Sequence, residues 1–245
     1  MLEFIRPDWP APARVQALTT TRSGGVSVAP FDSFNLAAHV GDEASRVEQN
    51  RSLLLRQADL PAQPSWINQT HGRQAVILED DDCRDADAAI TREEGRVAVV
   101  MTADCLPILL TNLAGDEVAA IHAGWRGLQA GVIQSTLAGM RSSGDQLLAW
   151  IGPGITQPSF EVGDEVREAF LQSTVDADAC FKGHGEGHWL CDLPGLAELT
   201  LRQQSIGAVS RDPHCSFGDE ELFYSYRRDG QSGRMASLIW IKSQP

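Results

Sequence analysis

Residues 97–105 read VAVVMTADC and residues 118–122 read VAAIH, and these two apolar runs decide how the chain folds. Short runs rich in valine, alanine and isoleucine are typical of buried strands. Each run ends in a residue that can bind a metal or act as a nucleophile, Cys105 in the first and His122 in the second. Polar residues at strand ends lie where α/β sheets collect their ligands. We therefore expect a functional site where these two strands end.

A third candidate ligand, His71, lies upstream in the run NQTHG at residues 68–72. Together with Cys105 and His122 it provides two imidazoles and one thiolate, a set suited to zinc. Each residue alone has an ordinary structural explanation, because cysteine is often buried as a small hydrophobe and histidine is often simply hydrogen-bonded. The three together predict a metal site, in which the fourth tetrahedral position is left to water or substrate.

Two carboxylates extend this candidate site. Asp104 immediately precedes Cys105, and Asp87 precedes a short apolar run at residues 88–90. Carboxylates beside metal ligands orient those ligands or move protons. We expect such roles for Asp104 and Asp87, with the capping of a short helix as the open alternative for Asp87.

Glycine and arginine residues nearby favour anion binding. The run GWRG at residues 124–127 opens an expected helix. Gly124 permits close backbone approach, and Arg126 adds a forked donor near the positive helix end, where phosphate and carboxylate groups bind. Arg22 stands two residues before a glycine pair and is a second candidate cradle. A purely structural turn is the alternative for both arginines.

Length and composition predict one globular domain over residues 1–245. Hydrophobic residues make up 42% of the chain and charged residues 22%, which is enough apolar surface for a large core. The formal net charge is −13, from 33 acidic and 20 basic residues. Such a surface repels polyanions, so we expect no nucleic-acid partner, although a local basic pocket can still hold a small phosphate.

The sequence favours a cytoplasmic protein that is not bound to a membrane. No stretch approaches the ~20 apolar residues of a membrane helix, and residues 1–12 carry charges and prolines where a signal peptide would be apolar. The five cysteines are odd in number and show no spacing typical of a disulfide framework. A reducing compartment fits them better.

Periodicity and turn residues place the other expected elements. Helices are expected at residues 42–57, 127–140, 165–171 and 193–204, and further strands at 17–22, 75–78, 147–155, 222–230 and 233–241. Residues 112–116 are expected to form a hairpin-type linker between the two apolar runs. The glycine-rich residues 182–191 are expected to form a mobile loop.

Several short strings, spread along nearly the whole chain, resemble those of one known family. They are TTRSGGVS (20–27), NL (35–36), HVGD (39–42), NQTHG (68–72), DADA (85–88), TADCLP (102–107), HAGWRG (122–127), IGP (151–153) and RRDG (227–230). In this order they are similar to the YfiH family, also called the laccase-domain, polyphenol oxidase or peptidoglycan-editing-factor family.

This resemblance implies a fold, a site and an activity. The fold is a single-domain α/β/α sandwich with mixed β-sheets, in the α+β class. The site binds zinc or copper through the residues matching His71, Cys105 and His122. The activity is phosphorolysis of adenosine, inosine or methylthioadenosine to the free base and the sugar 1-phosphate, with adenosine deamination as a companion activity. The implied partners are small purine nucleosides and phosphate, and the chain is a monomer or a homodimer.

The corresponding mechanistic hypothesis gives each candidate residue a role. A bound metal ion acts as a Lewis acid, with Cys105 as a thiolate ligand. The substrate and phosphate are bound by a group of candidate residues, in which arginines and backbone N–H groups hold the phosphate: Arg22, Arg126, Gly124 and Asp87. Asp104 or Asp87, in its protonated form, gives a proton to the leaving base.

Three alternatives stay open on the residues alone. A metal-free hydrolase or amidase acting on peptidoglycan precursors would use Cys105 as nucleophile and a histidine as base. A copper-dependent polyphenol oxidase (laccase) would use the same trio with Met101 nearby, but only four of the six histidines remain for a trinuclear cluster. A binding module with structural zinc would ordinarily need a fourth protein ligand.

Overall fold

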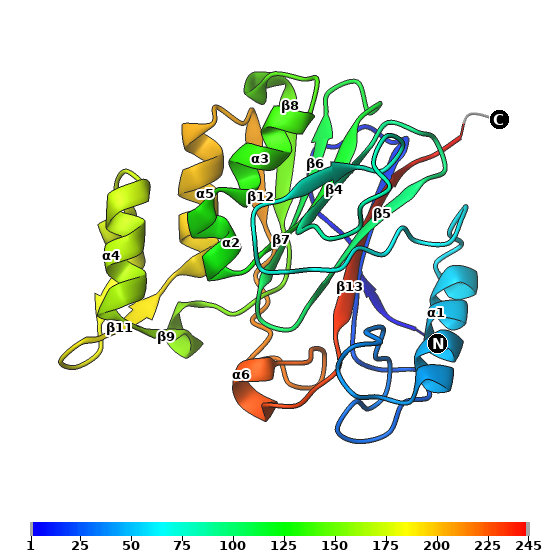
Figure 1. The fold of residues 1–245 in the computed structure, drawn as a ribbon, viewed down its shortest axis with the longest axis horizontal. Coiled ribbons are helices and arrows are strands. Elements are labelled where there is room, and N and C mark those ends of the chain that lie inside the picture. The colour runs from blue at the N-terminus through cyan, green and yellow to red at the C-terminus, as the bar shows by residue number, and fades with distance from the viewer. Residues whose placement is uncertain (1, 244–245) are drawn as a thin grey trace.

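The computed structural model describes residues 2–243 and alternates strands with helices (Figure 1). The strands are β1 (Phe4–Ile5), β2 (Val15–Thr20), β3 (Ala75–Ile77), β4 (Ala88–Thr91), β5 (Val97–Thr102), β6 (Leu106–Asn112), β7 (Val118–Ala123), β8 (Leu147–Ile151), β9 (Glu161–Gly163), β10 (Phe181–Gly183), β11 (His188–Cys191), β12 (Ala208–Arg211) and β13 (Met235–Ile241). The helices are α1 (Ala44–Gln57), α2 (Trp125–Ala130), α3 (Val132–Gly139), α4 (Asp164–Ser173), α5 (Leu193–Gln203) and α6 (Tyr226–Asp229). No helix within residues 2–243 has the length and apolar character to cross a membrane.

The described strands form three sheets. The largest has the order β12-β8-β6-β7-β4-β3, with parallel pairing at its two edges and antiparallel pairing between its central strands. A second, antiparallel sheet has the order β1-β2-β13-β5. The third is the small sheet β10-β11-β9, which lies beside α4.

Alternation of side chains along the strands builds the layers. In β6, Leu106, Ile108 and Leu110 pack with the helices, whereas Leu109 packs between the two large sheets. In β5, Ala98 and Val100 face that same space between the sheets. Because successive side chains of a strand point to opposite faces, both large sheets are covered on both sides.

Helices close the two outer faces of this pair of sheets. Figure 1 shows α2, α3, α4 and α5 together on one side of the strands and α1 on the other. The α/β/α sandwich with mixed sheets is therefore confirmed, with two sheets face to face in its middle.

One expectation about the strands is wrong, and its correction places the site. The linker expected at residues 112–116 does not join the two apolar runs, because β6 lies between them and pairs with β7. β5 belongs to the other large sheet, so residues 103–105 carry the chain from one sheet to the other. Asp104 makes this turn with a φ of +88°. Residues 103–105 contain neither glycine nor proline, so the sequence carries no turn signal at the crossing.

Three further expectations about local structure need correction. Residues 222–230 do not form a strand, because α6 starts there and the Ser225 hydroxyl caps it by accepting from the Arg228 amide. Residues 182–191 are not one loop, because β10 and β11 pair there and only residues 184–187 connect them. The helix expected at 127–140 is divided at Gly131, whose φ of +94° ends α2.

Candidate metal centre and its cavity

Three separate segments bring His71, Cys105 and His122 together. Cys105 follows the crossing between the sheets, His122 lies in β7, and His71 lies in the loop before β3. One ligand atom from each residue lies within 4.8 Å of the others. The two imidazole rings meet edge to face, with their centroids 4.8 Å apart. The trio singled out in the sequence is therefore a spatial cluster.

The loop that carries His71 is fastened to β5 by a side chain. The Gln69 amide donates to the Met101 carbonyl at 2.8 Å and accepts from the Met101 backbone N–H at 2.7 Å. This pair of bonds imitates a strand partner for the end of β5. It holds His71, whose φ is +57°, beside Cys105.

The Asp87 side chain holds two of the three candidate ligands in place through hydrogen bonds. Its carboxylate is fully buried and accepts from His122 Nδ1 at 2.8 Å and from the His71 backbone N–H at 3.0 Å. It also accepts from the amides of Thr70 and Gly72 and from the Thr70 hydroxyl. Burial opposes ionisation of Asp87, but these hydrogen bonds and the charge of His122 outweigh it and lower its pKa.

The bond to Asp87 also decides which nitrogen of His122 is available. Because Nδ1 donates to the carboxylate, Nε2 is the nitrogen left to face Cys105. Asp87 is thus placed to orient a ligand. It is a buried acceptor and is not among the residues that line the cavity, so the structure does not bring it to a substrate or phosphate.

Cys105 and His122 polarise each other. Burial favours the neutral thiol, but the charge and hydrogen bond of His122, assisted by His71, lower the pKa of Cys105 to about 6. Burial likewise favours neutral His122, but Cys105 and Asp87 raise the pKa of its imidazole to about 9. Without a metal the pair is a thiolate beside an imidazolium, and the thiolate is the form of cysteine that binds metals.

The absence of a side chain at Gly124 leaves the space that the three candidate ligands occupy. A Cβ atom at this position would stand 2.8 Å from Cys105 Sγ and 3.3 Å from His71 Nδ1. The backbone there is ordinary, with a φ of −69°, so the need for glycine is steric. Gly124 therefore serves the approach of the three ligands rather than an anion.

The donor set fits one zinc or copper ion. Ligand atoms that share a tetrahedral ion at 2.0–2.3 Å stand about 3.5 Å apart, so a cluster already within 4.8 Å needs only small movements. Two imidazoles and a thiolate of lowered pKa suit either metal. The buried partner of His122 completes the usual support of a metal-bound histidine.

The cluster forms part of the wall of a cavity of about 520 Å³. Its lining includes an apolar group of Ile155, Phe160 and Trp125, which belongs to the core between the six-stranded sheet and its helices. It also includes His39, Gln69, Arg126, Tyr226, Arg227 and Arg234. A cavity of this size holds a small organic ligand.

Asp104 lines the cavity but is tied to its surroundings. Its carboxylate accepts from the Ser216 hydroxyl at 2.8 Å and from the Arg227 backbone N–H at 2.7 Å. These bonds attach α6 to the crossing beside Cys105. The arrangement suits a residue that positions α6 better than one that carries an acidic proton.

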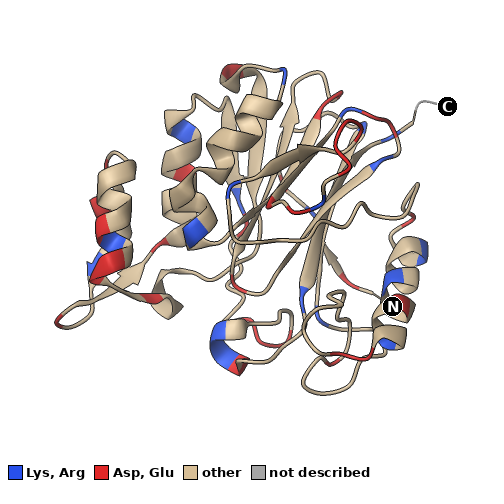
Figure 2. Ribbon diagram, viewed as in Figure 1, with Lys and Arg blue, Asp and Glu red and all other residues tan. Residues whose placement is uncertain are grey.

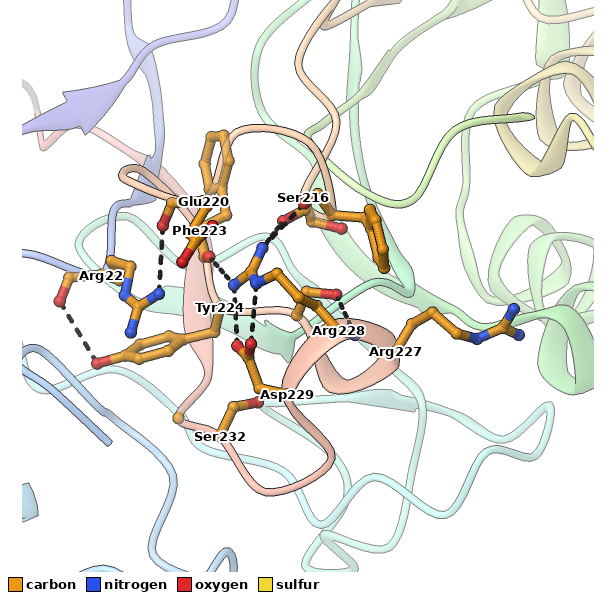
Figure 3. A network of polar contacts seen from close by, with 12 residues as sticks. Arg22, Ser216, Glu220, Phe223, Tyr224, Arg227, Arg228, Asp229 and Ser232 are labelled. Atoms are coloured by element: carbon orange, nitrogen blue, oxygen red, sulfur yellow. Dashed lines mark hydrogen bonds and ion pairs between the residues drawn. The ribbon is translucent and has the colours of Figure 1, made fainter. Parts of the chain in front are cut away.

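Arg126 lines the cavity, whereas Arg22 does not. The Arg126 side chain is exposed and lies over the Trp125 ring, with its Cζ 4.3 Å from the ring centroid. Arg22 donates to the carbonyls of Asp32 and Glu220 and lies over the Tyr224 ring. Figure 3 shows Arg22 beside Glu220 and Tyr224, well away from the side chain of Arg227. Arg22 therefore has a structural role.

Sequence reasoning did not assign several residues of the cavity wall. They are His39, Phe160, Tyr226, Arg227 and Arg234. Two of the matched strings, HVGD and RRDG, contained His39 and Arg227, and that was the one available signal. Figure 2 shows the basic residues of α6 as a blue segment at the lower edge of the molecule.

The neighbours of Arg227 explain how α6 is held at the cavity. The Arg227 guanidinium donates to the Glu161 carbonyl and lies over the Phe160 ring. The next residue, Arg228, donates to the carbonyls of Ser216, Phe217 and Phe223 (Figure 3). Adjacent arginines thus point in different directions, one to the cavity and one to the preceding loop.

Comparisons with known proteins agree with this architecture. A family model described as multi-copper polyphenol oxidoreductase laccase matches residues 16–242. A purine nucleoside phosphorylase of Pseudomonas aeruginosa is 46% identical, over 99% of this chain and 100% of its own. The purine nucleoside phosphorylase YfiH of Escherichia coli is 45% identical, over 98% of this chain and 100% of its own.

Solved structures share the fold. A crystal structure of a Neisseria meningitidis protein superposes with a TM-score of 0.93 at 43% identity, covering 98% of this chain and 99% of that one. The crystal structure of YlmD from Geobacillus stearothermophilus gives a TM-score of 0.91 at 26% identity, covering 98% and 96%. The fold that carries the candidate site therefore also occurs in a relative of only 26% identity.

Replacing Asp87 should weaken metal binding. Asp87→Asn removes the charge that holds His122, and we expect zinc affinity to fall by about 10- to 100-fold. The zinc affinity of each protein is measured by competition with a chromophoric chelator. Asp212→Asn is the matched control, because Asp212 accepts from His214 Nδ1 at the same 2.8 Å but His214 is not one of the three clustered ligands. Equal affinities in the two variants would contradict the role of Asp87.

Adding one methyl group at Gly124 should also lower the affinity for zinc, because the group collides with a candidate ligand. Gly124→Ala places Cβ against Cys105 Sγ, and a misfit of about 1–3 kcal/mol lowers zinc affinity by about 5- to 150-fold. Gly183→Ala is the control, because its nearest contact would be Trp189 at 3.9 Å. Wild-type zinc affinity in a folded Gly124→Ala protein would show that the ligands do not converge there.

The thiol of Cys105 should react at unusually low pH in chelator-treated protein. Its folded pKa of about 6 lies below the free value of about 8.5, so the thiolate appears as pH rises through about 6. Peptide mass spectrometry measures how fast iodoacetamide labels Cys105 at each pH. We expect the labelling rate to rise with a midpoint near pH 6, and bound zinc to protect the thiol from labelling. Buried Cys180, whose pKa burial raises to about 11, is the internal control. A midpoint near 8.5 for Cys105 would contradict the His122 contact.

Proposed function

This chain belongs to the YfiH family, described as multi-copper polyphenol oxidoreductase laccase, and we propose that it is a purine nucleoside phosphorylase. The observation that carries the proposal is similarity over the full chain to relatives of that name, at 45–46% identity. The cavity beside His71, Cys105 and His122 supports it through its size and its mixed lining.

The chemistry sets what the cavity must do. In phosphorolysis, the bond between the anomeric carbon of ribose and a purine nitrogen breaks. A bond from that carbon to a phosphate oxygen forms, and the base leaves with a proton. The site must therefore bind a flat, largely apolar base and a dianion at the same time.

The lining offers both kinds of contact. Phe160 and Trp125 present aromatic surface suited to a purine ring. Arginine side chains provide the planar donors that match phosphate. His71, Cys105 and His122 would hold the metal ion, which supplies Lewis acidity when bound.

Neither of the two carboxylates near the metal ligands is suited to protonate the leaving base. Asp87 is buried beneath His122, and its lowered pKa favours the charged form. Asp104 lines the cavity, but both its oxygens accept hydrogen bonds from the protein. We assign Asp87 to the orientation of His122 and Asp104 to the placement of α6.

We extend the proposal to the substrates that the family resemblance implies. They are adenosine, inosine and methylthioadenosine, with deamination of adenosine as a second reaction. Deamination leaves the sugar attached and needs no phosphate. The two reactions can therefore be told apart by their products, which are the free base in phosphorolysis and inosine in deamination of adenosine.

A thiol hydrolase is the second candidate function, because one observation favours it. Cys105, His122 and Asp87 stand in the order of a nucleophile, a base and the carboxylate that orients the base. Such an enzyme would form an acyl bond to Cys105 and would act without metal. Peptidoglycan precursors are its proposed substrates.

A copper-dependent polyphenol oxidase is the remaining alternative. The family description includes the word laccase, and the trio with neighbouring Met101 is compatible with a single copper. Within residues 2–243 one cluster of three potential metal ligands occurs, and His184, His188 and His214 are not among the cavity residues.

One incubation tests the proposed function. Pure protein is mixed with inosine or adenosine, with and without phosphate, and chromatography separates hypoxanthine, adenine and inosine. We expect base release that requires phosphate and is abolished by a strong chelator, with recovery on adding zinc. The sugar product should appear in equal amount as its 1-phosphate.

Other results of that incubation would overturn the proposal. Base release without phosphate would indicate a hydrolase, and conversion of adenosine to inosine alone would indicate a deaminase. Activity towards peptide amides that survives chelation and is lost on alkylation of Cys105 would favour the thiol enzyme. Phosphate-independent oxidation of phenols by copper-loaded protein, with no base release, would favour the oxidase.

A further inference from the structure

We propose that Arg234 and His39 form the subsite that binds phosphate, on the wall of the cavity away from Phe160. The inference rests on the proposed function and assigns its second substrate to particular residues. It differs from the expectation that Arg126, Arg22 and Gly124 hold the anion.

The Arg234 guanidinium is half-buried at the cavity. Burial lowers its pKa, and the nearby charges of Cys105 and Asp104 partly offset that effect. Among the described residues it forms no ion pair, and its hydrogen bonds all use Nη1, which donates to the carbonyls of Ser232 and Gly233 and to the Ser232 hydroxyl. The guanidinium nitrogens Nε and Nη2 remain as two donors on one edge of the planar group. That edge matches two oxygens of a phosphate.

His39 stands beside this guanidinium in the same cavity. Partial burial lowers the pKa of His39, and the neighbouring positive charges of Arg234, Arg51 and His71 lower it further. In the neutral form its ring still offers one N–H donor, which an anion accepts. Arg51 lies over the Trp66 ring and does not line the cavity. Arg234 and His39 are therefore the pair left for a ligand.

One buried side chain holds both residues in place. The Asn35 carbonyl oxygen accepts from the Arg234 backbone N–H at 3.0 Å and from the Ala37 amide at 3.0 Å. Its amide nitrogen donates to the Ala37 carbonyl and to Asp42. Asn35 is fully buried, so the turn that carries His39 and the start of β13 are locked to each other. A preorganised pair of donors of this kind favours specific binding.

The strand beside Arg234 leaves another polar group without a partner. Thr102 pairs with Met235 in the β5–β13 register and lines the cavity. It is 1% exposed, and its hydroxyl has no hydrogen-bond partner among the described residues. Buried polar groups are normally satisfied, so the Thr102 hydroxyl is a free hydrogen-bonding group in the wall next to Arg234.

The two walls of the cavity come from different layers. Arg234 directly precedes β13 of the four-stranded sheet, and His39 lies between Ala37 and Val40, which pack against that sheet. Phe160, Ile155 and Trp125 instead pack in the core of the six-stranded sheet. Displacement at the anomeric carbon forms the new bond on the face opposite the one that breaks. A base against Phe160 and a phosphate against Arg234 would place the ribose between them, beside the metal ligands.

The alternative at Arg126 is weaker because its side chain is exposed, whereas that of Arg234 is half-buried. Both guanidinium groups lie over an aromatic ring, Arg126 at 4.3 Å from the Trp125 centroid and Arg234 at 5.8 Å from the Tyr226 centroid. The helix that starts there, α2, spans 6 residues, which is too short for a strong terminal dipole. Arg126 also lies on the aromatic side of the cavity.

Steady-state kinetics on zinc-loaded protein test the subsite. In Arg234→Gln and His39→Gln we expect the KM for phosphate to rise, by about 10- to 100-fold in the arginine variant, because a charge-assisted fork is lost. The KM for inosine should change less than about twofold. Arg234→Lys retains the charge without the fork, and we expect it to recover only part of the affinity. Arg56→Gln, on the exposed face of α1, is the control for net charge.

Calorimetric titration with inorganic phosphate gives a readout that does not depend on turnover. We expect binding to wild-type and Arg56→Gln protein and weakened binding to both cavity variants, with thermal melting confirming that each variant is folded. His39→Gln covers the case in which Arg234→Gln fails to fold, because His39 is exposed.

The possible failures are distinguishable. If the wild-type protein releases no base with phosphate, the proposed function fails. If it does, but phosphate KM and phosphate binding are unchanged in folded Arg234→Gln and His39→Gln, the subsite is wrong. A rise in phosphate KM in Arg126→Gln alone would move the subsite to the opposite wall.

Discussion

The buried carboxylate of Asp87 is the interaction on which the candidate site depends. It accepts five hydrogen bonds, one from the His122 ring and four from residues 70–72. A carboxylate removed from water needs such compensation, and here the compensation comes from the segments that carry two candidate metal ligands. The bonds that stabilise this buried charge therefore also hold His71 and His122 next to each other.

The second constraint is the passage of the chain between sheets. Cys105 lies where β5 of one sheet gives way to β6 of the other, so the third ligand stands on the boundary between layers. The cavity opens at that boundary and takes one wall from each layer. Asp104 at the turn ties α6 to the same place through Arg227 and Ser216. This construction gives a single cavity both an apolar and a cationic surface.

Local patterns were enough to predict the trio and a supporting role for Asp87, whereas the sandwich was expected from the resemblance to the YfiH family. They were not enough for β6, because the turn made by Asp104 contains neither glycine nor proline. Arg22 looked like an anion cradle because a glycine pair follows it, but its partner Glu220 is 198 positions away. Arg234 was missed for the same physical reason, since Asn35, which fixes it, lies 199 positions away. Contacts of such separation leave no periodic signal.

X-ray absorption at the metal edge of zinc-loaded protein tests the central claim, which is that His71, Cys105 and His122 share one ion. The account predicts one sulfur at about 2.3 Å and two imidazole nitrogens at about 2.0–2.1 Å, with the sulfur lost in Cys105→Ser. A shell of oxygen and nitrogen alone in the wild-type protein, or a sulfur that persists in Cys105→Ser, would contradict it.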